Sequence, residues 1–513
     1  MEQLTPGEWA RAQLKRAPSF AVATVVTAAL LVVCAMIEYA PASEAPPALP
    51  PVRADVEQEE RQQIEEIDRN IDPEQPELEP MEDVPEAPEN QTQVETEIVE
   101  DRIPVEAEFI EDDTTVTQPT DPIPESFNKR LAAISIDSGS GGFRGQLGKI
   151  RSSAGKRQAA RMFGMKRGTD KAIMAGLRWL KKAQNKKTGG WDAQKWGANH
   201  RNRDAGVSGL ALLAFLGYGC TDVPRGRLAE FAPTVVKAIN YLIEQQEGSP
   251  GEGNEGWFGE RMYSQGICTM ALAEASELLQ NRILRSRARR AAQAGLDYII
   301  SKQPEHGSFT YTGPGRVNPG GRSSCDVSVT GFQLQAFKAA LTAKLEVPKE
   351  AIARCEKFLS INMCKDGSTL YRIDPRRYVQ RGSGKVSMTA ASLTGRLFLG
   401  HSRHGDDCKS QAAFLTKGDR HVQAAKKAHN LYTIYYMSLA MFNMGGRYWK
   451  EWNDAFNDAL RERQVKEGPE AGSWPTDFNY GRHGGRVYTT AMACMALEVY
   501  FRYLPTYKAL GKF

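Results

Sequence analysis

Apolar residues gather in six segments in the C-terminal part of the chain, and each segment is apolar on more than one face. A helix with this pattern is buried on all sides. The tenth residue of every segment is Ala or Gly, which lets neighbouring helices approach closely. The pattern therefore predicts six buried helices over residues 205–215, 262–272, 327–337, 386–396, 431–441 and 487–497.

More polar helical stretches lie between these segments and share one ending. The first ends in "QNKKTGGW" from Gln184 to Trp191, a Gln followed by a loop with Gly and an aromatic residue. Similar endings follow the helical stretches that reach Gln246, Gln303, Asn362 and Gln464, and the stretch around "SQAAFLTKGD" lacks one. Because Gly permits a sharp turn and an aromatic residue anchors a loop, we expect this motif to fasten each outer helix to the loop entering the next inner helix.

One polar helix followed by one buried helix, six times over, predicts an all-α fold with two concentric rings. The inner helices would run parallel to one another, and the outer helices would run antiparallel to them. An open solenoid is the alternative, but it would leave a large apolar surface exposed. The predicted domain is an (α/α)6 toroid of six helix pairs over residues 168–510.

The N-terminal part of the chain carries a different signal. Residues Ser19 to Ile37 are uncharged and apolar over a length that can span a bilayer. Basic residues precede this stretch and acidic residues follow it, so the positive-inside rule predicts a cytoplasmic N-terminus over 1–17 and a transmembrane helix over 18–39. A cleaved signal peptide is the alternative, with "APA" at 40–42 as the cleavage site.

Charge divides the rest of the chain. Residues 41–122 contain 26 acidic and 4 basic residues, whereas residues 123–513 carry a net charge of +26. The Pro/Glu-rich composition predicts a disordered acidic linker over 40–124, followed by a Gly/Ser-rich and then basic linker over 125–167. The acidic linker is expected to lean on the basic body through many weak, salt-sensitive pairs.

The Gln…Gly-Trp repeats and the apolar inner helices resemble the repeat of squalene cyclases and protein-prenyltransferase β-subunits. The resemblance covers about residues 168–510 and implies the toroid fold. It also implies an isoprenoid substrate, but the sequence contains no DxDD acid like that of squalene-hopene cyclases. Prenyltransferases hold Zn with an Asp-x-Cys and a His. The matching places here have Cys325, Asp326 and His429 in a different order, so the triad is irregular and a bound Zn is not expected.

Parallel inner helices would place six N-termini at one end of the ring, where their dipoles favour an anion. The residues at these N-termini include cations and tyrosines, and they form the predicted ligand rim of Arg261, Lys385, Arg486, Tyr263, Tyr432 and Tyr488. Asp326 and Asp204 are the candidate catalytic acids. The alternative is that these aspartates only cap their helices and pair with the cations.

Two hypotheses of different class follow. In the first, the ring is a membrane-anchored, extracytoplasmic binding module for a hydrophobic or anionic ligand, such as a lipid or isoprenoid or an acidic polymer, or for a partner protein. In the second, it is an isoprenoid enzyme. Nucleic acid is not an expected partner, because the basic body lacks the aromatic–basic interleaving of single-strand binders.

Overall fold

The computed structural model describes residues 145–249, 253–311, 326–372 and 384–503. All of them belong to one compact unit, Ile103–Phe513. The predicted transmembrane helix over 18–39 and the acidic linker over 40–124 lie outside the described residues. Within the described ranges, no helix combines the length and the apolar composition that a membrane crossing needs.

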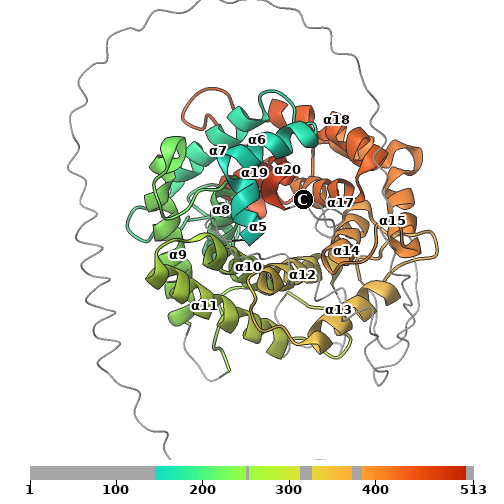
Figure 1. Cartoon of the computed structure of the whole chain (residues 1–513), viewed down its shortest axis with the longest axis horizontal. Coiled ribbons are helices and arrows are strands. Elements are labelled where there is room, and N and C mark those ends of the chain that lie inside the picture. Colours follow the sequence, from blue (N-terminus) through green and yellow to red (C-terminus); the bar gives the residue numbers. More distant parts are fainter. Residues whose placement is uncertain (1–144, 250–252, 312–325, 373–383, 504–513) are drawn as a thin grey trace, which may run out of the picture. The chain divides into compact units, whose positions relative to one another are not determined.

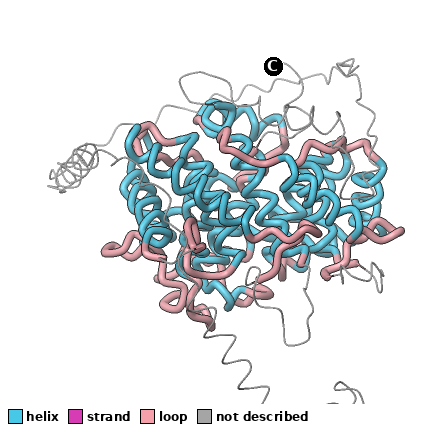
Figure 2. The backbone as a smooth tube through the Cα atoms, turned by 90° about the horizontal axis from the view of Figure 1, so that it is seen from below, coloured by secondary structure: helices cyan, strands magenta, loops and turns pink. Residues whose placement is uncertain are grey.

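Six helices form a closed inner ring, and each contacts the next, with the last returning to the first. Figure 1 shows this ring from the end, surrounded by a second ring of helices, and Figure 2 shows loops gathered at its two ends. Five of the six predicted segments begin within one residue of a helix start, and the sixth follows a break at Gly485. The inner helices are α8 Asp204–Tyr218, α10 Met262–Leu278, α12 Val327–Thr342, α14 Val386–Phe398, α17 Leu431–Met444 and α19 Gly481–Leu497.

The outer ring consists of amphipathic helices, each of which packs against the inner ring. The stretch that lacks the Gln motif is divided into two short helices joined by a 3-10 turn, so the fifth outer position is irregular. These outer helices are α7 Thr169–Ala183, α9 Ala232–Glu247, α11 Arg282–Ser301, α13 Lys349–Ile361, α15 Asp406–Thr416 with α16 Arg420–Lys427, and α18 Gly446–Glu462. The predicted toroid of alternating inner and outer helices is confirmed.

The Gln of each motif joins two neighbouring outer helices. The side-chain amide of Gln184, at the end of α7, donates to the carbonyl of Gly189 in its own loop at 2.7 Å and to the carbonyl of Thr234 in α9 at 2.9 Å. Gln464, at the end of α18, donates in the same way to Gly472 and to Ala172 in α7. This second pair closes the outer ring, because it links the last outer helix to the first.

The Gly of each motif is required by its backbone and by its surroundings. Gly189, Gly256, Gly307, Gly367 and Gly472 all have φ between +79° and +93°. A Cβ on any of them would lie 1.8–2.5 Å from a backbone carbonyl oxygen of a neighbouring outer helix. Only Gly combines the left-handed conformation with so close an approach.

The aromatic residue fastens the loop at both ends. The indole of Trp191 donates to the carbonyl of Leu180 in α7, and its backbone N–H donates to the hydroxyl of Ser208 in α8. Trp474 repeats both bonds with Leu460 and Thr490. The hydroxyl comes from the fourth residue of the inner segment, so the loop is bound to the outer helix before it and to the inner helix after it. The expected fastening role of the motif is confirmed.

The stretch 125–167, which we predicted to be a linker, needs correction over its second half. Helices α5 Gly145–Arg151 and α6 Ser153–Met162 lie there and contact α10 and the C-terminal helix α20 Val499–Arg502. The guanidinium of Arg151 is buried and donates to the carbonyls of Leu216 and Arg502. The composition resembled a linker because these helices are short and depend on long-range contacts that a local pattern does not show.

A buried ionic layer occupies the end of the inner ring that receives α5. The carboxylate of Glu274 in α10 lies 2.9 Å from the guanidinium of Arg151 and 3.3 Å from that of Arg502, and it accepts a hydrogen bond from Tyr503. Burial alone would raise the pKa of Glu274, but the two guanidinium groups outweigh it and hold this pKa below its usual value. Burial raises the pKa of Glu498, at the end of α19, well above its usual value, although the charges of Arg502, Arg151 and Lys156 oppose this shift.

The pH dependence of stability should reveal how α6 is buried. Lys156 donates to the carbonyl of Tyr218 at 2.7 Å, and burial lowers the pKa of its ammonium from 10.5 to about 8. Between these two values the unfolded chain holds the proton that the folded chain has released, so stability rises with pH. Relative to a Lys156→Met variant, the wild type should gain about 1.4 kcal/mol per pH unit in this window. Urea unfolding of both proteins measures the difference, and parallel pH profiles would contradict the burial of a titrating amine.

Candidate anion-binding site at the mouth of the ring

The inner helices have their N-termini at the end of the ring opposite the ionic layer, and we call this end the mouth. The repeated loops cross it and place side chains near the helix N-termini. In three of the loops, the residue four positions after the left-handed Gly contacts the N-terminus of the preceding inner helix. Glu260, Tyr311 and Tyr371 occupy this place in successive loops. Two backbone hydrogen bonds show how these loops meet the helix N-termini. The N–H of Met262 in α10 donates to the carbonyl of Tyr311, and the N–H of Val327 in α12 donates to the carbonyl of Tyr371.

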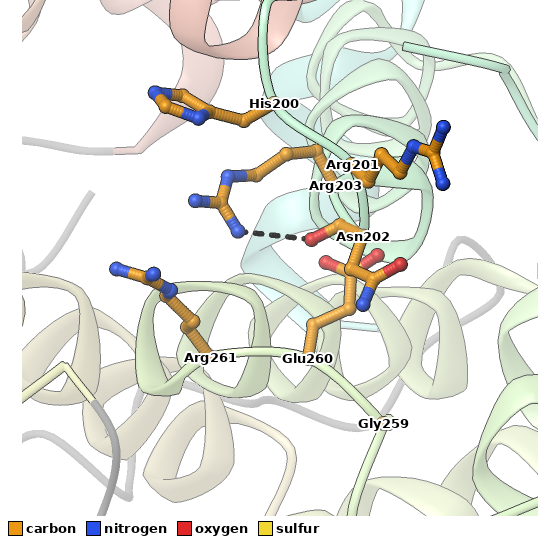
Figure 3. Close-up of a pocket in the computed structure, with 7 residues that line it drawn as sticks. All are labelled: His200, Arg201, Asn202, Arg203, Gly259, Glu260 and Arg261. Carbon is orange, nitrogen blue, oxygen red and sulfur yellow. Dashed lines mark hydrogen bonds between the residues drawn. The ribbon is translucent and has the colours of Figure 1, made fainter. Parts of the chain in front are cut away.

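A pocket of about 230 Å³ opens between the N-termini of α8 and α10 (Figure 3). Figure 3 shows the guanidinium groups of Arg203 and Arg261 turned to the same side as the imidazole of His200. Among the described residues, neither guanidinium forms an ion pair, and Arg203 donates only to the carbonyl of Asn202 at 2.9 Å. We call this the arginine pocket, lined by His200, Arg201, Asn202, Arg203, Gly259, Glu260 and Arg261.

Glu260 is the one carboxylate in the lining, and it is already engaged. Its two oxygens accept hydrogen bonds from the backbone N–H groups of Ala205 at 2.8 Å and Gly206 at 3.1 Å, and from the hydroxyl of Ser264 at 2.5 Å. It thus caps α8 from the neighbouring repeat. Burial raises the pKa of Glu260, and these hydrogen bonds oppose the shift. The carboxylate stabilises the helix and leaves the outer face of the pocket positive.

The two arginines repel each other. Burial lowers the pKa of Arg203, and the nearby charge of Arg261 lowers it further, while Glu260 opposes both effects. Two cations held together in a partly enclosed site form a strong field for an anion, and guanidinium groups bind carboxylate and phosphate with paired hydrogen bonds. The predicted ligand residue Arg261 therefore lies in a site suited to that role.

A second group of side chains continues the mouth beside the pocket. The hydroxyls of Tyr311 and Tyr371 lie 2.6 Å apart, and both rings are half-buried. The guanidinium of Arg372 lies 4.8 Å from the ring centre of Tyr371, and the ammonium of Lys385 lies 5.3 Å from it. We call these four residues the tyrosine rim.

Asp326 is the N-cap of α12 rather than a free acid. Its side chain accepts from the backbone of Ser328 and Val329 and from the hydroxyl of Ser328, and it pairs with Arg372 at 3.3 Å. Its carboxylate is thus engaged as the capping hypothesis expected. Cys325 lies outside the described residues, and His429 is exposed. Within the described part of the chain, no group of three His, Cys, Asp or Glu side chains is arranged to hold a metal.

Two other predicted site residues, Asp204 and Arg486, are engaged in contacts within the fold. Asp204 begins α8 and accepts from the backbone of Ala193 at 2.9 Å, and burial raises its pKa. Arg486 does not join Arg261 and Lys385, because it donates to the hydroxyl of Ser473 and lies 3.5 Å from Glu470 in the loop after α18. Two of the three predicted rim cations, Arg261 and Lys385, therefore lie at the mouth. Arg203 and Arg372 are two further cations there, which the sequence analysis did not include.

The three predicted tyrosines are half-buried near the starts of their inner helices. Tyr263 donates to the hydroxyl of Ser328, and Tyr432 donates to its carbonyl. Tyr488 is half-buried, and burial raises its pKa. Beneath them, Tyr435 and Tyr436 are fully buried, and both hydroxyls bond to the side chain of Gln335. These two side chains are therefore part of the packed, hydrogen-bonded interior between α12 and α17.

Sequence reasoning missed Arg203, Glu260, Tyr311, Tyr371 and Arg372. A signal for three of them was present, because Glu260, Tyr311 and Tyr371 share one position relative to the repeated Gly. Arg203 and Arg372 had no such signal, since they lie in loops whose lengths differ between repeats.

Neither a family model nor a curated protein matches the chain. Solved structures show a distant likeness. One is an inactive variant of an alpha-1,6-mannanase from Salegentibacter in complex with alpha-1,6-mannotriose, at 10% identity and a TM-score of 0.45, covering 64% of this chain and 98% of that one. Another is a type II terpene cyclase from Scytonema in complex with geranylgeranyl dihydroxybenzoate, at 13% identity and a TM-score of 0.40, covering 65% and 97%. At these values neither likeness bears on what this protein binds.

Proposed function

We propose that the ring is a binding module that takes an anionic ligand at its mouth. The observation that supports this proposal most directly is the pair of guanidinium groups of Arg203 and Arg261, which share one pocket without a carboxylate partner among the described residues. The N-terminus of α10 lies beside them and adds its dipole. A carboxylate, sulfate or phosphate group matches this charge and the pocket's size.

The alternative, an enzyme acting on an isoprenoid, has less support from the described interior. Such an enzyme needs an apolar chamber for the hydrocarbon and an acid or metal at its end. Tyr435 and Tyr436 are instead buried with their hydroxyls bonded to Gln335, and Glu274, Arg151 and Arg502 form a buried ionic layer. A hydrocarbon chain would have to displace hydrogen-bonded and charged groups, which is unfavourable.

The place of the protein in the cell is part of the same proposal. The apolar segment 18–39 anchors the chain in a membrane with residues 1–17 in the cytoplasm, and the ring lies on the other side. Support for this topology comes from the sequence alone. There the mouth would meet acidic polymers or acidic segments of proteins rather than nucleic acid.

Binding of inorganic triphosphate tests the anion site. We expect Arg203→Gln and Arg261→Gln each to weaken binding by about tenfold, because each removes a charged hydrogen-bond donor. The matched control is Arg290→Gln, which removes an exposed arginine on α11 and should leave the affinity unchanged. Isothermal titration calorimetry of the purified full chain measures all four proteins. Equal affinities in the three variants and the wild type would contradict the site, and so would a lack of binding in the wild type.

A further inference from the structure

Two histidines lie side by side at the edge of the arginine pocket. His200 lines the pocket (Figure 3), and the ring of His483 lies beside it, with the two ring centres 5.1 Å apart. The ring of Tyr480 follows at 5.4 Å from that of His483. Neither imidazole has a hydrogen bond or an ion pair among the described residues. We call His200 and His483 the histidine pair.

The pair lies at the seam where the ring closes. His200 belongs to the loop before α8, the first inner helix, and His483 belongs to the first turn of α19, the last one. The N–H of Asn199, next to His200, donates to the carbonyl of Arg482, next to His483, at 2.7 Å. A Cβ on Gly485 would lie 2.6–2.9 Å from the backbone of the same loop. Backbone contacts therefore hold the two rings together, and the closure of the ring brings His483 to the pocket.

The electrostatic surroundings of the pair differ from those of two other histidines. Those two lie against carboxylates, namely His401 against Glu356 at 2.8 Å and His421 against Glu451 at 3.1 Å. The pKa of His483, by contrast, is lowered by partial burial of its ring and by the nearby charges of His200 and Arg203. Its neighbours therefore oppose the protonated form, because the pocket already carries positive charge.

The charged and titratable groups around the pair come from three segments. They are Asp192, Lys195, Arg201, Arg203 and Asp204 before α8, Asp477, Tyr480, Arg482 and Arg486 at the start of α19, and Glu260 and Arg261 before α10. The four carboxylates are already engaged. Asp192 and Asp204 accept from backbone N–H groups of their own loop, Glu260 caps α8, and Asp477 pairs with Arg463. Cations thus outnumber carboxylates around the pair.

An anion held by Arg203 and Arg261 would change this balance, because it places negative charge beside the imidazoles. A neutral imidazole can then accept a proton and donate a further charged hydrogen bond. We propose that the histidine pair is part of the anion site and takes up one proton from the solvent when the anion binds. This inference rests on the proposed anion site, and it adds His483 to the residues of that site and pH to the factors that control it.

The direction of the pH effect follows from linkage. If the pair holds a proton more tightly with the anion bound than without it, affinity rises as the pH falls from about 7.5 to about 5.5. It levels off once the pair is protonated in the free protein as well. An opposite charge nearby typically shifts a pKa by about one unit or more, so the gain in affinity should be about tenfold. The anion itself is not altered, since only a proton from water is bound.

The first test counts protons while inorganic triphosphate binds to the purified full chain. Isothermal titration calorimetry at pH 6.5, in two buffers of different ionisation enthalpy, gives the number taken up. Triphosphate also titrates near this pH, so the double variant His200→Gln/His483→Gln serves as the reference and the ligand's contribution cancels. We expect the wild type to take up about half a proton more than this variant. Equal proton counts would overturn the inference.

His404→Gln is the matched control for these measurements. The pKa of His404 is likewise lowered, by burial and by Arg403 and Lys409, but this histidine lies in the loop before α15. We expect this variant to bind triphosphate with the proton uptake of the wild type. A loss of uptake in His404→Gln equal to that in the double variant would show that the effect does not belong to the pair. Thermal unfolding followed by circular dichroism checks that each variant is folded.

A second test replaces the titrating ring by a permanent charge. His483→Arg should bind triphosphate about fivefold more tightly than the wild type at pH 7.5, where the wild-type pair is mostly neutral in the free protein. At pH 5.5 the two proteins should bind alike. A variant that binds no more tightly than the wild type at pH 7.5 would contradict a role for positive charge at this position.

The outcomes separate this inference from the proposed function. If triphosphate binding depends on Arg203 and Arg261 but the wild type and the double variant take up equal numbers of protons, the anion site stands and the role of the pair is wrong. If triphosphate does not bind the wild type at pH 5.5, 6.5 or 7.5, the proposed function itself fails, and this inference fails with it.

Discussion

Replacing Gly307 by Ala is expected to lower the free energy of unfolding by about 3–5 kcal/mol. Gly307 has φ of +81°, and an added Cβ would lie 1.8 Å from the carbonyl oxygen of Arg354 in α13. The left-handed conformation alone costs about 1–3 kcal/mol for a residue with a side chain, and the clash with a helix backbone adds the overpacking term. Urea denaturation followed by helical circular dichroism measures the loss.

Gly468→Ala provides the matched control. Gly468 has a similar φ of +76°, but no atom lies within 4 Å of an added Cβ. We expect this variant to lose only about 1 kcal/mol, the contribution of the backbone conformation. If both variants lose the same amount, the close approach of the repeated loop to the next outer helix is not what requires Gly there.

Glu274→Gln should destabilise the fold by about 3–5 kcal/mol, although it changes only one atom. The variant leaves the guanidinium groups of Arg151 and Arg502 buried without their shared carboxylate, which is the costly way to break an ion pair. The loss should also loosen the contact of α5 with the ring, because Arg151 is its buried anchor. Hydrogen exchange in residues 145–162 reports that second effect, and denaturation reports the first.

Glu498→Gln is the control for this prediction, since both carboxyl groups are almost completely buried and both lie next to Arg502. Burial raises the pKa of Glu498 well above its usual value and therefore favours its neutral form, so exchange for a neutral amide should cost no more than about 1 kcal/mol. The asymmetry between the two variants is the decisive result. Equal losses would show that the charge of Glu274 is not what holds the layer together.

The architecture could be predicted from the sequence because it depends on local and repeated features. The inner helices are apolar all round, and the structure buries nearly every residue of α8, α12 and α17. In the two motifs that contain Trp, the Gln and the Trp bond to partners at the same place in their repeats, as the pattern indicated. A repeated unit shows its packing many times along one chain, so even a single sequence carries the signal.

The candidate site was only partly predicted, because a helix terminus does not determine the partners of its side chains. Arg261 and Lys385 lie at the mouth as expected, but Arg486 pairs with Glu470, and Asp326 caps its own helix and pairs with Arg372. Each of these outcomes depends on which loop crosses above the helix end. Glu260 shows the same dependence, since it caps a helix that begins more than fifty residues earlier in the chain.

The sequence by itself determined the periodic part of this protein: two alternating helix types, the turns that join them and the acidic, proline-rich composition ahead of them. These follow from hydrophobic period, from the conformational freedom of Gly and from charge, which are local properties. Only the tertiary structure decided that Arg151, from a supposed linker, completes the ionic layer, that Tyr435 and Tyr436 bond to Gln335 in the interior, and that Arg203 and Arg261 share a pocket. Those three features arise from contacts between residues far apart in the chain, and their energies depend on burial and on neighbouring charges that exist only once the ring has closed.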